Sequence, residues 1–320
     1  MLGKRLAAAS LLAVAAGLSL ATLLNQGETT GREGASTSAD AAIAKVRAGF
    51  RPGDLVRIVP AWNEDLWARL KGIGPGAELF PFAALLRGDR IDTLTLLRGE
   101  RIWVIGTHGR QAVPPERLFT ELEPTERSTL EDGTEVALYT PPTVGWFGSL
   151  SRSLKSASVA RRDPSGHERE CTWKRDRFRC GKEGWENPQV ATRDVFHNEV
   201  SWVLAHPPPN NETLVIRWTV AGGSVLAVRT GFTLKGVRKE QGSSTSVRIM
   251  IDGKEADSFT LEPHEYRLEL RLHPLGALES REIRFEIHAS DHRLRQLMLE
   301  ADVLGDAPPM LIEAATYSAL

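Results

Sequence analysis

Short strand-like segments dominate the second half of this 320-residue chain, and they restrict its fold more than any other feature. Runs rich in β-branched and aromatic residues are separated by turns rich in glycine and proline, and apolar and polar residues alternate clearly in 247–251 and 283–287. The pair Asp252-Gly253 is typical of a tight hairpin turn. We therefore expect an antiparallel β-sandwich, or jelly roll, over residues 157–305. The expected strands are 190–196, 200–205, 213–220, 225–231, 246–252, 257–261, 266–272, 282–289 and 297–303.

The first half alternates instead between strand and helix patterns. This alternation predicts a small three-layer α/β domain over residues 41–142 with a partly parallel sheet, so that the chain as a whole is α+β. The expected strands are 55–59, 101–106 and 134–139, the last at a sheet edge; the expected helices begin at Asn63 or Glu64 and at Pro114, and 82–97 fits either state.

The N-terminus has a short basic end, with Lys4 and Arg5, followed by an uncharged apolar run at residues 6–24. As a helix rising about 1.5 Å per residue, this run spans roughly 28 Å, close to the hydrocarbon thickness of a bilayer. We expect an uncleaved signal anchor over residues 1–24, which makes the chain a single-pass protein of a bacterial inner membrane with its domains on the periplasmic side. The alternative is a signal peptide that is cleaved after Ala21 and releases a secreted protein.

Three further segments are expected to lie outside the folded domains. Residues 25–40 contain Gly, Thr, Ser, Ala and Glu but no large apolar residue, which predicts a disordered tether. Residues 143–156 are expected to link the two domains, and residues 306–320 to form a C-terminal tail.

Cys171 and Cys180 are the only cysteines in the sequence. A hairpin with a two-residue turn at 175–176 places them opposite each other, on the face that also carries Trp173 and Phe178. Their Cα atoms then lie about 4.5 Å apart, within the range of a disulfide, and an oxidising compartment preserves such a bond. Arg-Asp is not a favoured pair for this turn, so a longer loop with a shifted register is the alternative. Neither a zinc site nor a catalytic dithiol is expected from these two cysteines.

The segment 152–183 carries ten Lys or Arg against five Asp or Glu, although the whole chain has a net charge of −1. A cytoplasmic protein with this segment would be considered for nucleic-acid binding, but export argues against that partner. We interpret the segment as a solvated basic edge. Contact with anionic lipid or with an acidic envelope glycan is the alternative.

Polar loops follow two of the predicted strands of the first domain. Trp62 and Glu64 follow the first strand, and His108 and Arg110 follow the second. Ligands bind at this edge of open α/β sheets, and Glu64 and His108 would form an acid/base pair if the two strands were neighbours. Surface loops commonly carry such residues, and neither a nucleophile motif nor a nucleotide-binding motif accompanies them. We therefore interpret these residues as part of an ordinary surface loop, with a ligand-binding rim as the alternative, and we predict no catalytic residue.

The order of strands in the second half resembles that of galactose-binding-like jelly rolls, a group that includes carbohydrate-binding modules. The residues that carry this resemblance are 204–208, 214–218, 226–231, 247–253, 265–272 and 284–289. It implies a glycan held by aromatic faces and planar polar groups. Trp202 and Trp218 are expected to be buried because they lie in strands. The candidate ligand-binding residues are Trp185, His206, Arg229, Tyr266 and Asp291.

Residues 50–142 resemble the soluble domain that trails the membrane part of some dolichol-phosphate-mannose-type (GT-C) glycosyltransferases. The similarity lies in residues 50–56, 60–62, 101–105 and 135–139. The multi-span catalytic part of those enzymes has no counterpart in this sequence, so the resemblance implies only an envelope-glycan context.

These features together predict an exported, membrane-tethered, non-catalytic binding or scaffold protein of the bacterial envelope. Its expected partners are a glycan and the membrane, with no nucleic acid, cofactor or metal. The alternatives are an enzyme that acts on envelope polysaccharide and a protein–protein assembly factor. A glycosidase would need two carboxylates at a defined separation, and the sequence does not place Glu64, Glu199 and Asp291 relative to one another.

Overall fold

The computed structural model describes residues 39–71, 80–81, 84–88, 91–114, 116, 119, 122–196, 198–237, 242–276, 279–293 and 295–305. The expected anchor, most of the expected tether and the expected C-terminal tail lie outside these residues. Residues 39–49 are helical, so the last two residues assigned to the tether belong to a helix. Within the part that is described, no helix is both long enough and apolar enough to cross a membrane.

The chain divides into two compact units. The first comprises Met1–Leu85, Trp103–Pro114 and Pro124–Tyr139. The second comprises Leu86–Ile102, Pro115–Glu123 and Thr140–Leu320. Short segments from the expected first domain are therefore grouped with the sandwich.

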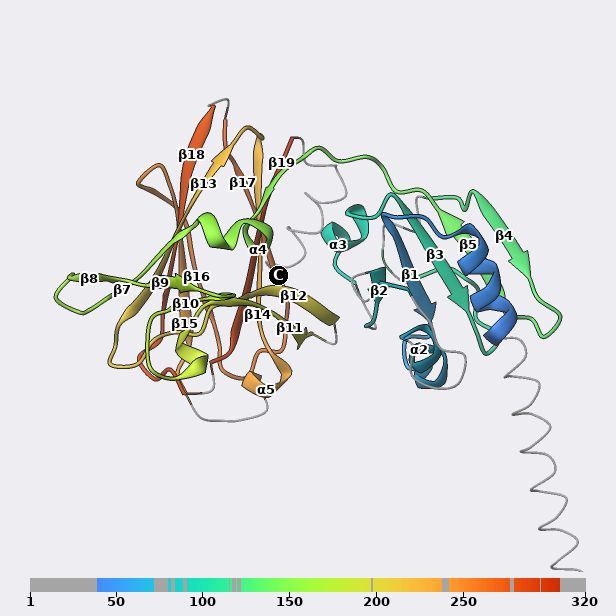
Figure 1. Cartoon of the computed structure of the whole chain (residues 1–320), viewed down its shortest axis with the longest axis horizontal. Helices are drawn as coiled ribbons and strands as arrows, with labels where there is room; N and C mark the ends of the chain where they lie inside the picture. The colour runs from blue at the N-terminus through green and yellow to red at the C-terminus, as the bar shows by residue number, and fades with distance from the viewer. Residues whose placement is uncertain are drawn as a thin grey trace, which may run out of the picture. The chain divides into compact units, whose positions relative to one another are not determined.

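A sheet in the strand order β2-β1-β3-β5-β4 forms the first unit together with helix α2. The carboxyl ends of β1 and β3 meet, because the Thr107 N–H donates to the Val59 carbonyl at 2.8 Å, and Figure 1 shows both arrows pointing the same way. Asn63 caps α2 by accepting from the Leu66 N–H, which confirms the predicted start of this helix. The elements are β1 (Asp54–Val59), α2 (Glu64–Leu70), β2 (Leu85–Leu86), β3 (Arg101–Gly106), β4 (Glu126–Thr129) and β5 (Glu135–Tyr139).

Two sequence expectations for this region need correction. β5 lies inside the sheet, because the mostly exposed segment Glu126–Thr129 pairs with it as β4 and takes the edge. The ambiguous segment 82–97 contains both states, the short strand β2 and the helix α3 (Thr93–Leu97). The helix expected at 114–122 lies largely outside the described residues.

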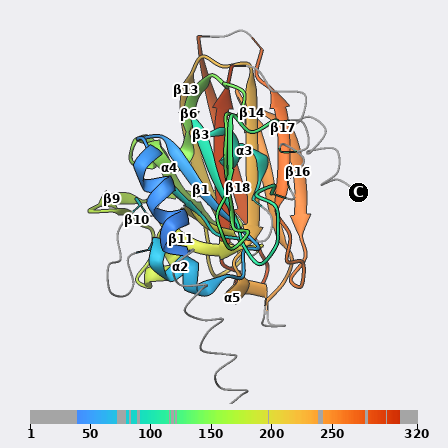
Figure 2. The same ribbon diagram turned by 90° about the vertical axis from the view of Figure 1, so that its right-hand side faces the viewer.

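Two antiparallel sheets form the sandwich of the second unit, as predicted (Figures 1 and 2). Over the described residues, one sheet has the order β17-β14-β19-β12-β11-β10-β9 with β6 also paired to β19, and the other has the order β16-β15-β18-β13-β7-β8. The strands are β6 (Trp146–Ser149), β7 (Ser158–Arg162), β8 (Glu168–Glu170), β9 (Thr172–Lys174), β10 (Arg177–Arg179), β11 (Gln189–Val195), β12 (Asn198–Leu204), β13 (Thr213–Ala221), β14 (Val225–Phe232), β15 (Thr245–Ile251), β16 (Lys254–Leu261), β17 (Glu269–Pro274), β18 (Ser280–His288) and β19 (Leu297–Leu304). The short helices are α4 (Leu150–Ser153), η3 (Leu154–Ser156), η4 (Gly184–Glu186) and α5 (Leu234–Val237).

Apolar residues from both sheets meet in a large buried cluster between them. β15 contributes Val247 and Ile249, and β18 contributes Ile283, Phe285 and Ile287. These are the alternating residues that the sequence pattern places on one face. The turn between β15 and β16 has positive φ angles at Asp252 (48°) and Gly253 (75°), as the predicted hairpin requires.

The segment 143–156, expected to be a linker, belongs to the sandwich. β6 pairs with β19, with Gly148 opposite Val303, and α4 and η3 follow it directly. Leu150 and Leu154 are buried in the sandwich core. The strand has only four residues, and three of them are exposed or half-buried, so its pattern is too short to be recognised in the sequence.

Candidate functional site

A cavity of about 450 Å³ lies on the second unit, beside β6, α4 and β13, and we call it the aromatic groove. Figure 2 shows β6 and β13 at the same end of the sandwich, and the two strands contact each other. Its volume is within the range of small-molecule binding sites. The groove is lined by Arg98, Trp146, Phe147, Gly148, Ser149, Arg152, Ser153, Trp218, Thr219, Val220 and Ala221.

Phe147 is the exposed ring of the groove. Its relative exposure of 55% is unusual for a large apolar side chain in this structure. The ring lies directly over Gly222, where an added Cβ would come within 2.7 Å of it, and against Gly305. Gly222 has a φ of 74°, a conformation that side-chain-bearing residues rarely adopt. Glycines therefore seat the ring and leave the rest of it to solvent.

Trp146 and Trp218 supply two further rings. Trp218 is buried in the core, as its position in a strand predicts, and Gly148 lies close to its outer edge. Trp146 is half-buried, and the Arg98 guanidinium lies 5.3 Å from the centre of its ring. This distance is within the range of a cation–π contact.

Two arginines border these rings and differ in their surroundings. Arg98 is held by an ion pair with Asp302 and by a hydrogen bond to Ser149 Oγ at 3.4 Å. Arg152, on α4, is exposed, and among the described residues nothing pairs with its guanidinium. The groove therefore has one fixed guanidinium and one that is open to a ligand.

A buried ionic network underlies the groove. Asp302 lies between Arg98 and Arg229, and Arg229 also binds Asp92 at 2.6 Å. Burial alone would lower the pKa of Arg229, but Asp92, Asp302 and Glu300 outweigh this effect and raise it. Burial, followed by the charge of Asp302, raises the pKa of Glu300, whose carboxylate accepts from Ser149 Oγ and the Ser151 N–H.

Arg229, one of the candidate ligand-binding residues, lies inside the strand expected over residues 225–231. It lies within β14, its side chain is fully buried, and it contacts the Trp202 ring at 4.9 Å. Its charge is balanced by carboxylates that are distant in sequence, so the strand pattern did not reveal this role.

Three of the predicted residues do come together elsewhere on the sandwich. Trp185 stacks on His292, with ring centres 5.1 Å apart, and its ring also lies 4.7 Å from that of His206. Asp291 precedes His292 and binds Arg293, whose hydrogen bond lowers the pKa of the Asp291 carboxyl to about 2. We call these residues the histidine cluster.

The ring of His206 is closed to solvent. It is only 6% exposed, and Nδ1 lies 2.7 Å from the Pro207 carbonyl oxygen. Burial lowers the pKa of His206 from 6.5 to about 4; the hydrogen bond to Pro207 opposes this shift, and the nearby His292 and Arg295 contribute to it. The histidine cluster therefore presents a half-buried Trp185 and an already paired Asp291 to a ligand, whereas the aromatic groove presents an exposed ring and an unpaired cation.

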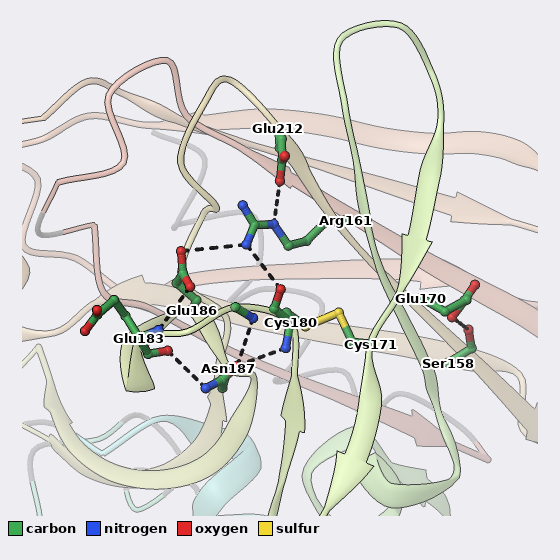
Figure 3. Close-up of a disulfide and its surroundings, with 10 residues drawn as sticks. Ser158, Arg161, Glu170, Cys171, Cys180, Glu183, Glu186, Asn187 and Glu212 are labelled. Carbon is green, nitrogen blue, oxygen red and sulfur yellow. Dashed lines mark hydrogen bonds and ion pairs between the residues drawn. A yellow bond between two sulfur atoms is a disulfide. The ribbon is translucent and has the colours of Figure 1, made fainter.

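The disulfide fixes the loop that carries Trp185 (Figure 3). Cys171 and Cys180 are bonded, with Cα atoms 4.7 Å apart, and Trp173 pairs with Phe178 in the predicted register. The turn consists of two residues, 175 and 176, and Arg175 adopts the positive φ of 62° that such a tight turn requires. The predicted hairpin is therefore confirmed, and the alternative of a longer loop is not needed.

Buried polar side chains hold the same loop from the other side. The Asn187 side chain is fully buried and accepts from the N–H groups of Cys180 (2.9 Å) and Gly181 (3.2 Å). Arg161 pairs with Glu212 and donates to the Cys180 carbonyl at 3.2 Å, and Figure 3 shows these groups around the disulfide. This network fixes the backbone on which η4 places Trp185.

Tyr266 lies apart from both sites. It is half-buried, its hydroxyl donates to Asp194, and its ring centre is 5.8 Å from that of Phe196. It thus braces the β11 end of the sandwich.

In the first unit, the predicted rim does assemble after β1 and β3. Trp62 is 62% exposed and stacks on His108, with ring centres 5.0 Å apart. His108 Nε2 also lies 3.4 Å from Asn63 Nδ2. Glu64 and Arg110 are exposed at the same rim. No group of three or more His, Cys, Asp or Glu side chains comes together as a metal site anywhere in the described ranges.

The aromatic groove is not among the predicted sites, because its exposed ring, Phe147, lies in the segment 143–156 that is expected to be a linker. The available signal was the pair Trp146-Phe147 between Gly145 and Gly148. Adjacent aromatics in a supposed linker are unexpected, because linkers rarely contain large apolar residues.

No family model and no curated protein matches this chain. The solved structures that it matches include carbohydrate-binding modules, the group that its strand order resembles. The CBM51-2 and INT domains of Clostridium perfringens ZmpB in complex with GlcNAc match at 13% identity and a TM-score of 0.30, over 58% of this chain and 41% of that one. A CBM36 module in complex with calcium and xylotriose matches at 13% identity and a TM-score of 0.21, over 36% of this chain and 83% of that one.

A third match, the CBM51 of Clostridium perfringens GH95 in complex with methyl-galactose, has 9% identity and a TM-score of 0.22. It covers 57% of this chain and 93% of that one. This chain spans less than half the length of the ZmpB structure it matches. Similarities of this size carry no argument about ligands, so the fold assignment rests on the sheets described above.

Proposed function

We propose that this chain is an exported, membrane-tethered binding protein of a bacterial envelope, and that its β-sandwich holds a glycan in the aromatic groove. The observation that supports this most directly is an exposed Phe147 ring beside two guanidinium groups in a cavity of about 450 Å³. Sugars bind through one apolar ring face and a rim of hydroxyl groups, and this arrangement offers partners for both.

The fixed parts of the groove favour binding because little has to be ordered when a ligand enters. Glycine backbones seat Phe147, and Asp302 and Ser149 hold Arg98. A preorganised site loses less conformational entropy on binding than a flexible one. A glycan of one or two units would therefore find the stacking ring and the donor already in position.

The proposed protein binds the glycan without hydrolysing it. Glycoside hydrolysis requires two carboxyl groups on either side of the bond that is cleaved. Glu300 and Asp302, the carboxyl groups beneath the groove, are fully buried and bound to Arg98, Arg229 and Ser149. The residues that line the groove include neither Asp nor Glu in the part of the chain described.

A glycan array probed with the full-length chain tests this function. The protein would be purified in a detergent without a sugar headgroup, so that the detergent does not occupy the site. We expect retention on at least one bacterial envelope polysaccharide, and no new reducing ends when that polysaccharide is incubated with the protein. An absence of binding across the array would contradict the proposal, and release of reducing ends would favour the alternative of an enzyme.

A further inference from the structure

The charge of the aromatic groove indicates which kind of sugar it takes. Among the residues that the structure describes, its lining contains two arginines and no acidic residue. The carboxylates closest to it, Glu300 and Asp302, are completely buried beneath it. A ligand in the groove therefore contacts guanidinium groups directly, whereas these carboxylates are not exposed to it.

The carboxylates of the buried network offset the positive charge of Arg98. Asp302 contacts both Arg98 and Arg229, and Asp92 provides a second carboxylate for Arg229. The two guanidinium groups therefore face these two carboxylates and also Glu300, which lies 3.9 Å from Arg98 and whose pKa is raised by burial. Arg98 is thus an oriented hydrogen-bond donor, suited to a sugar hydroxyl, with a side chain that is 22% exposed.

Arg152 differs from Arg98 because no described carboxylate offsets its positive charge. It lies on α4, on the same wall of the groove as Ser149 and Ser153, and is exposed. Among the described residues, no carboxylate pairs with it. A planar guanidinium in this state binds a carboxylate or an oxyanion ester through two parallel hydrogen bonds.

We propose that the glycan held in the aromatic groove carries an anionic group, as a uronic acid or a sulfate ester does, and that Arg152 binds this group while Phe147 stacks on a sugar ring. The inference rests on the proposed function, because it concerns the ligand of the same groove. The net charge of the chain is −1, so the attraction is local to the groove and not a property of the whole protein.

The test compares three probes against the full-length chain: tetragalacturonate, its methyl ester, and a sulfated galactose tetrasaccharide. The ester keeps the sugar rings and removes the charge. We expect the galacturonate or the sulfated sugar to bind about tenfold more tightly than the ester, since one hydrogen-bonded ion pair supplies a difference of that order. The acid that binds more tightly identifies the anionic group.

Variants then locate the effect. Arg152→Gln should weaken binding of the preferred acid about tenfold and leave binding of the ester unchanged. Lys155→Gln is the matched control, because Lys155 is an exposed cation on the adjacent η3 that does not line the groove. Its affinities should equal those of the unmodified chain.

The outcomes separate this inference from the proposed function. If the ester binds as tightly as both acids, or if the strongest ligand on the array is neutral, the anionic preference is wrong while glycan binding stands. If Lys155→Gln has the same effect as Arg152→Gln, the attraction is a general surface effect and the site assignment fails. If neither the probes nor the array show any binding, the proposed function fails together with the inference.

Discussion

His206 is the residue whose surroundings give the protein its most specific pH dependence. Burial lowers its pKa from 6.5 to about 4, so the ring is neutral in the folded protein at pH 5, while the unfolded chain takes up a proton there. Stability rises with pH wherever the unfolded state binds more protons. The contribution of His206 is therefore complete above about pH 6.5 and is lost as the pH falls to about 4, with an upper bound of about 3 kcal/mol.

Urea unfolding of the unmodified chain and of His206→Asn between pH 7 and pH 4 checks this prediction. The stability of the unmodified chain should fall more steeply with decreasing pH than that of the variant. Comparing the two removes the contribution of Glu300, whose raised pKa acts in the opposite direction. Parallel curves for the two proteins would show that His206 is not held neutral by the fold.

Individual residues were predictable from the sequence where their partners are close along the chain. Asn63 caps a helix through an N–H three residues later, and such local patterns can be read directly. Arg229 was not predictable, because its partners Asp92 and Asp302 lie 137 and 73 positions away. The sequence around an arginine in a strand does not indicate which carboxylates the tertiary fold will place beside it.

At the scale of elements, the disulfide hairpin makes the clearest prediction. Replacing both Cys171 and Cys180 by Ser should lower the free energy of unfolding by about 2–3 kcal/mol, because the bond restricts the unfolded chain. Urea unfolding measures the loss, and Thr172→Ser, a small change on the outer face of the same hairpin, is the control. Two free thiols per chain in the denatured, non-reduced protein would contradict the bond itself.

The hairpin also shows why some elements are easier to predict than others. The spacing of Cys171, Trp173, Phe178 and Cys180 favours one register, and the structure has that register. β6 has no comparable spacing, since it is only four residues long, three of them pair with β19, and glycines occupy positions 145 and 148. The sequence therefore predicts the bounds of long strands with clear alternation to within a few residues. For the short strand β6, which lines the groove, it predicts a linker instead.

At the scale of the whole molecule, we predict that the apolar run at residues 6–24 determines where the protein works. We expect the full-length chain to fractionate with the inner membrane and to resist extraction by high salt, because an uncleaved apolar helix holds it there. Replacing Leu11 and Leu12 by Lys should move the chain to the soluble fraction or prevent its export. N-terminal sequencing that finds a mature end at Thr22 would show a cleaved signal and contradict the anchor.

The central claim is that the aromatic groove binds a glycan, and one affinity measurement tests it most directly. The dissociation constant for the strongest ligand from the array would be measured for the unmodified chain, Phe147→Ala, Trp185→Ala and Val190→Ala. Val190 is the control, because it is an exposed apolar residue on β11 outside the groove, with a relative exposure of 43%. We predict that Phe147→Ala weakens binding about fivefold to tenfold, as expected for an aromatic stacking contact of about 1 kcal/mol, and that the other two variants bind normally. Unchanged binding by Phe147→Ala, or a loss confined to Trp185→Ala, would contradict the claim and place the ligand elsewhere.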